Sequence, residues 1–106
     1  MAQHIGLAIQ DEQGIVLERS ELNFAELLNL IETFKQFDTL YPTTASIDPY
    51  ADTLLDSHKV EFLIAELEQA SNRQSEKKFT DSVAAICRFL GKVRGHADHY
   101  VKFIGD

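Results

Sequence analysis

The chain has 106 residues, 44% hydrophobic and 25% charged, a composition typical of one globular domain spanning residues 1–106. Cys87 is the only cysteine, which excludes an intrachain disulfide, and no run of 18 apolar residues is present to span a bilayer. The net charge of −7 makes nucleic acid and membranes poor partners, because an acidic surface repels phosphates.

Two short apolar runs, Ile5–Ile9 and Ile15–Leu17, flank the turn residues Asp11–Gly14 near the N-terminus. β-Branched residues favour extended backbone, and Gly14 can adopt the positive φ that such a turn often needs. The pattern predicts a β-hairpin.

An amphipathic helix is predicted over residues 23–36. Asn23 and Glu26 resemble a capping box, in which the Asn side chain accepts a backbone N–H and the Glu reaches back. The apolar stripe recurs at helical spacing. Its members are Phe24, Leu27, Leu28, Ile31 and Phe34.

The helical period disappears between Phe37 and Thr53, where Pro42 and Pro49 disfavour helix in the preceding residues. We expect a loop, with at most a short extended piece at Thr44–Ile47. Loops of this length are uncommon in small domains unless they serve a function or pack locally.

A second helix is predicted to be capped by Thr53 or Asp56 and to end near Ala70. Its stripe is Val60, Leu63, Ile64 and Leu67. After the polar connection 71–78, a third helix begins close to Lys77 and ends where Gly95 can take a left-handed conformation. Its stripe is Phe79, Val83, Ile86, Leu90 and Val93.

The β-prone segment Tyr100–Ile104 is expected to join the N-terminal hairpin as a third strand, because a lone hairpin is only marginally stable. The predicted fold class is therefore α+β. Three amphipathic helices pack on a small antiparallel sheet made of the hairpin and the C-terminal strand.

Catalytic motifs are absent from the sequence. It contains neither a Gly-x-Ser-x-Gly elbow nor a glycine-rich phosphate loop, and Cys87 beside Ile86 is interpreted as a small core residue rather than a nucleophile. We therefore expect a protein that is not an enzyme.

Three possible metal ligands, His96, Asp98 and His99, fall within four residues. No second ligand cluster accompanies them, and a His-rich segment also follows from the favourable interaction of His⁺ with a helix C-terminus. We expect a solvated helix end, no metal and no other cofactor.

The acidic residues are concentrated in residues 1–70, with 13 acids against 3 Lys/Arg, whereas residues 71–106 carry 4 acids and 7 Lys/Arg. The candidate binding residues are Asp48, Tyr50, Asp52, Asp56, Glu61 and Glu68. A tyrosine among carboxylates suits an Arg- and Lys-rich site on another protein. The same acids could instead cap the second helix, and the charge imbalance could serve solubility alone.

Two segments of seven residues each, Ile47–Thr53 (Ile-Asp-Pro-Tyr-Ala-Asp-Thr) and Tyr100–Asp106 (Tyr-Val-Lys-Phe-Ile-Gly-Asp), carry a family resemblance. With the Glu-rich helix between them, they resemble small bacterial proteins encoded beside toxins, including immunity proteins of contact-dependent growth inhibition systems. In that pattern a glycine often stands in place of Ala51. The signature positions implied by the resemblance are Asp48, Tyr50, Asp52 and Thr53.

The resemblance implies a cytoplasmic, non-catalytic protein that binds one cognate toxin tightly, often over the active site of a nuclease domain. Nucleases hold phosphates with Lys and Arg, so an inhibitor that presents carboxylates gains electrostatic steering. The start of the chain, which lacks the features of a signal peptide, also leads us to expect a cytoplasmic protein. We expect a monomer or weak dimer.

The alternative function is that of a small adaptor or regulatory subunit that binds a cellular protein. This alternative requires exposed apolar residues, for which Phe37, Leu40 and Tyr41 are the candidates. Binding through such residues is insensitive to salt, whereas binding through carboxylates is weakened by salt.

Overall fold

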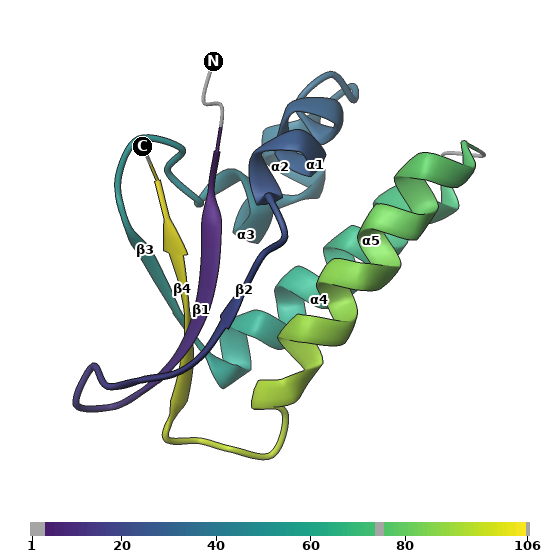
Figure 1. The fold of residues 1–106 in the computed structure, drawn as a ribbon. Helices are drawn as coiled ribbons and strands as arrows, with labels where there is room; N and C mark the ends of the chain where they lie inside the picture. Colours follow the sequence, from purple (N-terminus) through teal and green to yellow (C-terminus); the bar gives the residue numbers. More distant parts are fainter. Residues whose placement is uncertain (1–3, 74–75, 106) are drawn as a thin grey trace.

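The structure is a computed structural model that describes residues 4–73 and 76–105 (Figure 1). Part of the polar connection 71–78 and Asp106 of the C-terminal motif lie outside the described residues. The elements are β1 (Gly6–Asp11), β2 (Val16–Ser20), α1 (Phe24–Ile31), α2 (Phe37–Leu40), α3 (Pro42–Ala45), β3 (Thr53–Asp56), α4 (Ser57–Asn72), α5 (Lys77–Leu90), the 3-10 helix η1 (Gly91–Val93) and β4 (His99–Ile104).

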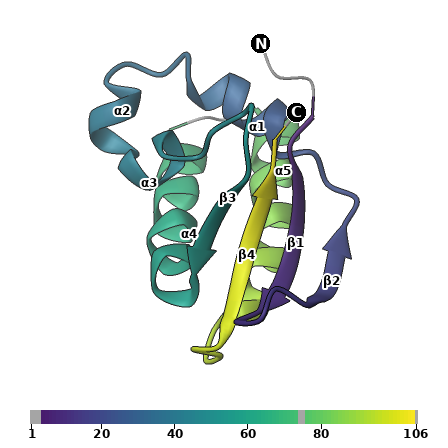
Figure 2. The ribbon, with the colours of Figure 1, turned by 90° about the vertical axis from the view of Figure 1, so that its left-hand side faces the viewer.

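The predicted α+β class is confirmed. The four strands form one antiparallel sheet in the order β2-β1-β4-β3. The helices lie on one face of this sheet and leave the other face uncovered (Figures 1 and 2). Among the described residues, no helix combines the length and the apolar character needed to cross a bilayer.

The N-terminal hairpin and the C-terminal strand are as predicted. Gly14 has a φ of 87°, and the Asp11 carboxylate accepts backbone hydrogen bonds from Gln13 and Ile15, both 2.9 Å long, which close the turn. β4 pairs with β1 along its whole length, so the C-terminal segment completes the sheet next to the hairpin.

The segment predicted as a loop contains regular structure. The short helix α2 lies in the expected loop, and α3 stands where we expected the extended piece at Thr44–Ile47. The extended segment is instead β3, which pairs with β4. α3 forms because the Glu66 carboxylate of α4 accepts hydrogen bonds from the backbone N–H groups of Thr43 (3.0 Å) and Thr44 (2.8 Å). A cap supplied from another helix gives no local sequence signal.

Two predicted helix ends need correction. α1 ends at Ile31 rather than at residue 36, and the chain then turns through Gln36, which has a φ of 59°. Phe34 nevertheless packs against the core, with its ring 5.9 Å from that of Phe79. The third helix ends at Leu90 and continues as η1, so Gly95, with a φ of 77°, lies beyond the helix rather than at its end.

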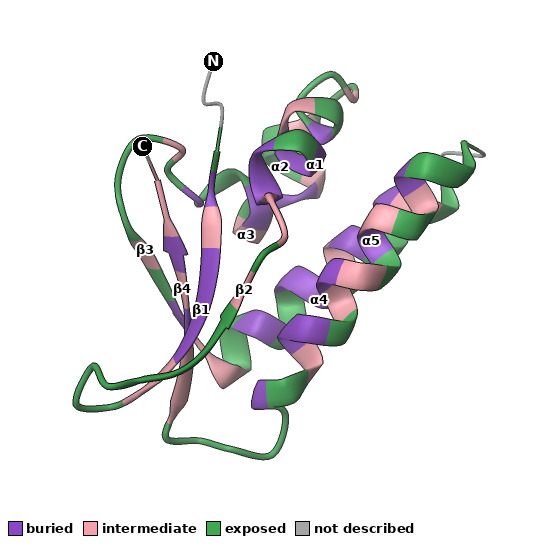
Figure 3. Cartoon of the chain, viewed as in Figure 1, coloured by how far each residue is buried: buried purple, intermediate pink, exposed green. Residues whose placement is uncertain are grey.

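The core lies between the sheet and the helices (Figure 3). Every predicted stripe residue of the second and third helices is buried. The sheet contributes Leu7, Ile9, Leu55, Val101 and Phe103. Phe103 packs edge-on against Phe24 of α1 with ring centroids 5.0 Å apart, so α1 is anchored to the central strand β4.

Candidate functional site

The loop Asp48–Asp52, between α3 and β3, is held by hydrogen bonds within the chain. The backbone N–H of Asp48 donates to the Thr53 hydroxyl (3.0 Å), and the backbone N–H of Tyr50 donates to the Asp48 carboxylate (2.8 Å). Asp48 and Thr53 therefore shape this loop. The side chain of Tyr50 is 59% exposed, so the fixed backbone presents an aromatic ring to solvent.

The same loop packs closely on the C-terminal segment. A Cβ atom on Gly105 would lie 2.5 Å from the carbonyl oxygen of Ala51 and 2.8 Å from that of Pro49, so only glycine fits there without a shift of backbone. Lys102 of β4 pairs with Asp52 at 3.4 Å. The two sequence segments that carry the family resemblance are thus one unit in space.

The other three predicted binding residues lie elsewhere. Asp56 caps α4 by accepting a 2.8 Å hydrogen bond from the backbone N–H of Lys59, as the capping interpretation predicts. A strand advances about 3.3 Å per residue, which places Asp56 about 13 Å beyond Asp52. Glu61 pairs with Arg94 at 2.6 Å, and Glu68 lines a hollow between α4 and α5. Only Asp48, Tyr50 and Asp52 form one group.

The fold pairs basic residues of the C-terminal third with acidic residues of the first 70 positions, so the two charges are less separated in the structure than along the sequence. Three cations of the C-terminal third each pair with an acid of the first 70 residues: Lys92 with Glu18, Arg94 with Glu61, and Lys102 with Asp52. All three pairs are largely exposed, and such pairs contribute at most about 1 kcal/mol each to stability. Each pair neutralises one acid of the first 70 residues.

The apolar residues proposed for an adaptor surface are not exposed. Tyr41 is fully buried, and Phe37 and Leu40 are half-buried against the core. The expectation was wrong because α3 packs on α4 and α2 packs on α3, which no local pattern reveals.

Exposed apolar residues instead occur at positions other than the three candidates for an adaptor surface. Leu54 on β3 is 49% exposed and Phe62 on α4 is 53% exposed, with the Phe62 ring edge-on to His58. The exposure of Phe62 could have been predicted from the helical spacing, because Phe62 falls outside the apolar stripe of the second helix. Ile15, Val16 and Leu17, at the edge strand β2, are also exposed.

Cys87 is half-buried and packs against the core, as predicted. Burial and, to a smaller extent, the nearby Glu68 carboxylate raise the pKa of its thiol to about 11, while Arg94 opposes the shift. A thiol in this state is a poor nucleophile, because the thiolate is the reactive form.

Iodoacetamide is expected to alkylate Cys87 at least about tenfold more slowly near neutral pH than it alkylates the urea-unfolded chain, with a rate that rises until the pH approaches the raised pKa. Mass spectrometry of timed samples measures both rates. Equal rates in the folded and unfolded chain would show that the thiol is not protected.

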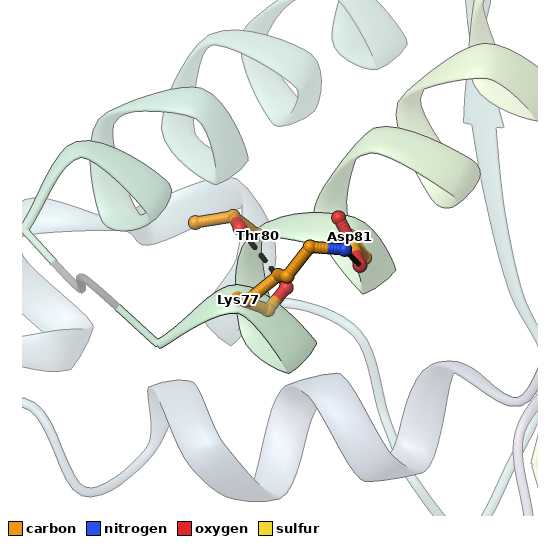
Figure 4. A network of polar contacts seen from close by, with 3 residues as sticks. All are labelled: Lys77, Thr80 and Asp81. Atoms are coloured by element: carbon orange, nitrogen blue, oxygen red, sulfur yellow. Dashed lines mark hydrogen bonds and ion pairs between the residues drawn. The ribbon is translucent and has the colours of Figure 1, made fainter.

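A hollow of about 510 Å³ lies between α1 and α5, with Leu27 and Ile86 in its lining. Two of its lining residues, Lys77 and Asp81, form an ion pair at 3.3 Å. The Thr80 hydroxyl, which lines a different hollow, donates to the Lys77 carbonyl at 3.0 Å (Figure 4). These contacts stay within the first turns of α5. Charged side chains of both helices, among them Glu26 and Lys78, also line this hollow.

The histidines lie beyond the helix end at which we expected them. His96 and His99 occupy the turn between η1 and β4, closed by hydrogen bonds from the His96 N–H to the Val93 carbonyl (3.1 Å) and from the His99 N–H to the His96 carbonyl (3.0 Å). His96 thus lies against the C-terminal end of η1, while His99 begins β4.

No family model, curated protein or solved structure matches the chain. The function is therefore inferred from the residues and from their geometry.

Proposed function

We propose that the chain is an immunity protein that binds a basic bacterial toxin domain in the cytoplasm, a nuclease domain by preference, and neutralises it by covering its active site. The observation that carries this proposal is the exposed Tyr50 ring between Asp48 and Asp52, on a loop whose backbone is fixed. Tyrosine is a frequent interface anchor, and a preorganised loop loses little conformational entropy on binding.

Charge supports this proposal at long range. The net charge of −7 attracts a Lys- and Arg-rich domain and accelerates association, even though several acids are paired within the chain. Asp56, Glu61 and Glu68 contribute to that field, whereas contact is assigned to the Asp48–Asp52 loop. No bond is made or broken, because neutralisation requires only that the toxin's substrate is excluded.

The test is made with the toxin domain encoded by the gene next to that of this chain. The purified chain is expected to abolish the toxin's activity at a ratio of one to one, and co-expression is expected to restore growth of cells that make the toxin. A neighbouring gene without a toxin domain, or full toxin activity in excess chain, would refute the proposal.

One observation favours the adaptor function as a second candidate. Ile15, Val16 and Leu17 are 60%, 40% and 49% exposed, and they lie at β2, an edge strand of the sheet. An apolar edge strand can pair with a strand of a cellular protein. Binding of this kind would persist in high salt and be lost on Leu17→Ala.

A further inference from the structure

The turn between η1 and β4 brings three metal-ligating side chains together. We propose that His96, Asp98 and His99 bind one divalent cation of the zinc class. Their ligand atoms all lie within 4.8 Å of one another. The two imidazole rings stack with centroids 4.6 Å apart, so they must rotate out of this stack for both nitrogens to face one ion.

The geometry is close to that of a zinc site. Ligands of a tetrahedral Zn²⁺ lie about 2.0–2.2 Å from the ion and so about 3.4 Å from one another. His96 and Asp98 are exposed and His99 is partly exposed, so side-chain rotation can close the remaining gap. The two hydrogen bonds of the turn and the left-handed Gly95 hold the three residues close together.

The surroundings do not oppose a cation. Lys92, Arg94 and Lys102, the basic residues nearest along the chain, are each paired with a carboxylate from another part of the fold. Asp11 lies opposite His99 in the register of β1 and β4 and adds negative charge at this end of the sheet.

The donor set selects the class of ion. Two imidazoles and one carboxylate suit zinc and its first-row neighbours, whereas magnesium and calcium prefer oxygen ligands alone. Three protein ligands leave a fourth position for water or for a side chain of a partner. The site lies at the opposite end of β4 from Gly105, so this inference does not rest on the proposed toxin contact.

Isothermal titration of the full, untagged chain with zinc chloride tests the site. We expect one ion per chain, with an affinity at least about tenfold weaker in His96→Gln and in His99→Gln, since each variant removes one ligand. His58→Gln is the matched control, because it removes an exposed imidazole that lies outside the cluster. Circular dichroism verifies that each variant is folded.

At a zinc concentration near the wild-type Kd, zinc is also expected to raise the Tm of the wild-type chain and of His58→Gln more than that of His96→Gln, because this variant binds the ion more weakly. The proposal is overturned if no saturable binding is seen, if His96→Gln and His99→Gln bind as tightly as the wild type, or if His58→Gln loses as much affinity as they do.

Discussion

Gly105→Ala is expected to lower the free energy of unfolding by about 1–3 kcal/mol and to displace the Asp48–Asp52 loop. The added methyl group would lie within 2.8 Å of three backbone atoms of Pro49 and Ala51, and backbone atoms cannot rotate away as a side chain can. The loop must therefore move, which separates Asp52 from Lys102 and changes the direction of the Tyr50 ring. Urea unfolding measures the loss of stability.

Gly91→Ala is the matched control. A Cβ atom on Gly91 meets nothing within 4 Å, and its φ of −62° suits any residue, so this variant is expected to be as stable as the wild type or more stable by about 0.4–1 kcal/mol. If both glycine variants unfold at the same urea concentration, close packing on the loop is not the reason that position 105 requires glycine.

Glu66→Ala is expected to lower the free energy of unfolding by about 2–3 kcal/mol, because charge-assisted hydrogen bonds are lost and buried donors are left without their acceptor. The Glu66 carboxylate accepts from the Thr43 and Thr44 backbone and from the Thr44 hydroxyl (2.9 Å). Thr44 is fully buried. The loss corresponds to a decrease in Tm of about 10–20 °C for a domain of this size.

Glu68→Ala provides the control for this prediction. Glu68 lies two residues further along α4 and is exposed, so its removal is expected to change stability by no more than about 0.5 kcal/mol. Differential scanning calorimetry compares the variants. If Glu66→Ala has the same Tm as Glu68→Ala, the hydrogen bonds between α3 and α4 contribute little to the stability of the fold.

The spacing of apolar residues along the sequence was sufficient to predict the longer helices, in which four or more apolar residues recur at helical intervals. The helical stripes and the hairpin turn at Gly14 are local signals, and each stripe residue of α4 and α5 is buried as expected. β3 has only four residues, and α3 depends on Glu66, more than 20 positions away. Contacts of that range leave no periodic pattern, so the segment from residue 37 to 53 was predicted as a loop.

The candidate site was only partly predictable for a related reason. The loop between α3 and β3 was identified from its tyrosine and carboxylates, but composition cannot show which acids are paired. Arg94 neutralises Glu61 across 33 positions, and Lys102 reaches Asp52 through the pairing of β4 with β3. Charge counted along the chain therefore overstated the acidic face, and the exposed ring of Tyr50 became its most specific feature.

The affinities of Tyr50→Ala and Leu17→Ala for the neighbouring gene's toxin domain test the central claim most directly. Both side chains are about half exposed, so neither change should unfold the chain. We expect Tyr50→Ala to weaken binding by about 30-fold, the loss typical of an interface anchor, and Leu17→Ala to leave the Kd unchanged. Wild-type affinity in Tyr50→Ala, with binding lost in Leu17→Ala, would contradict the assignment of the Asp48–Asp52 loop as the recognition surface.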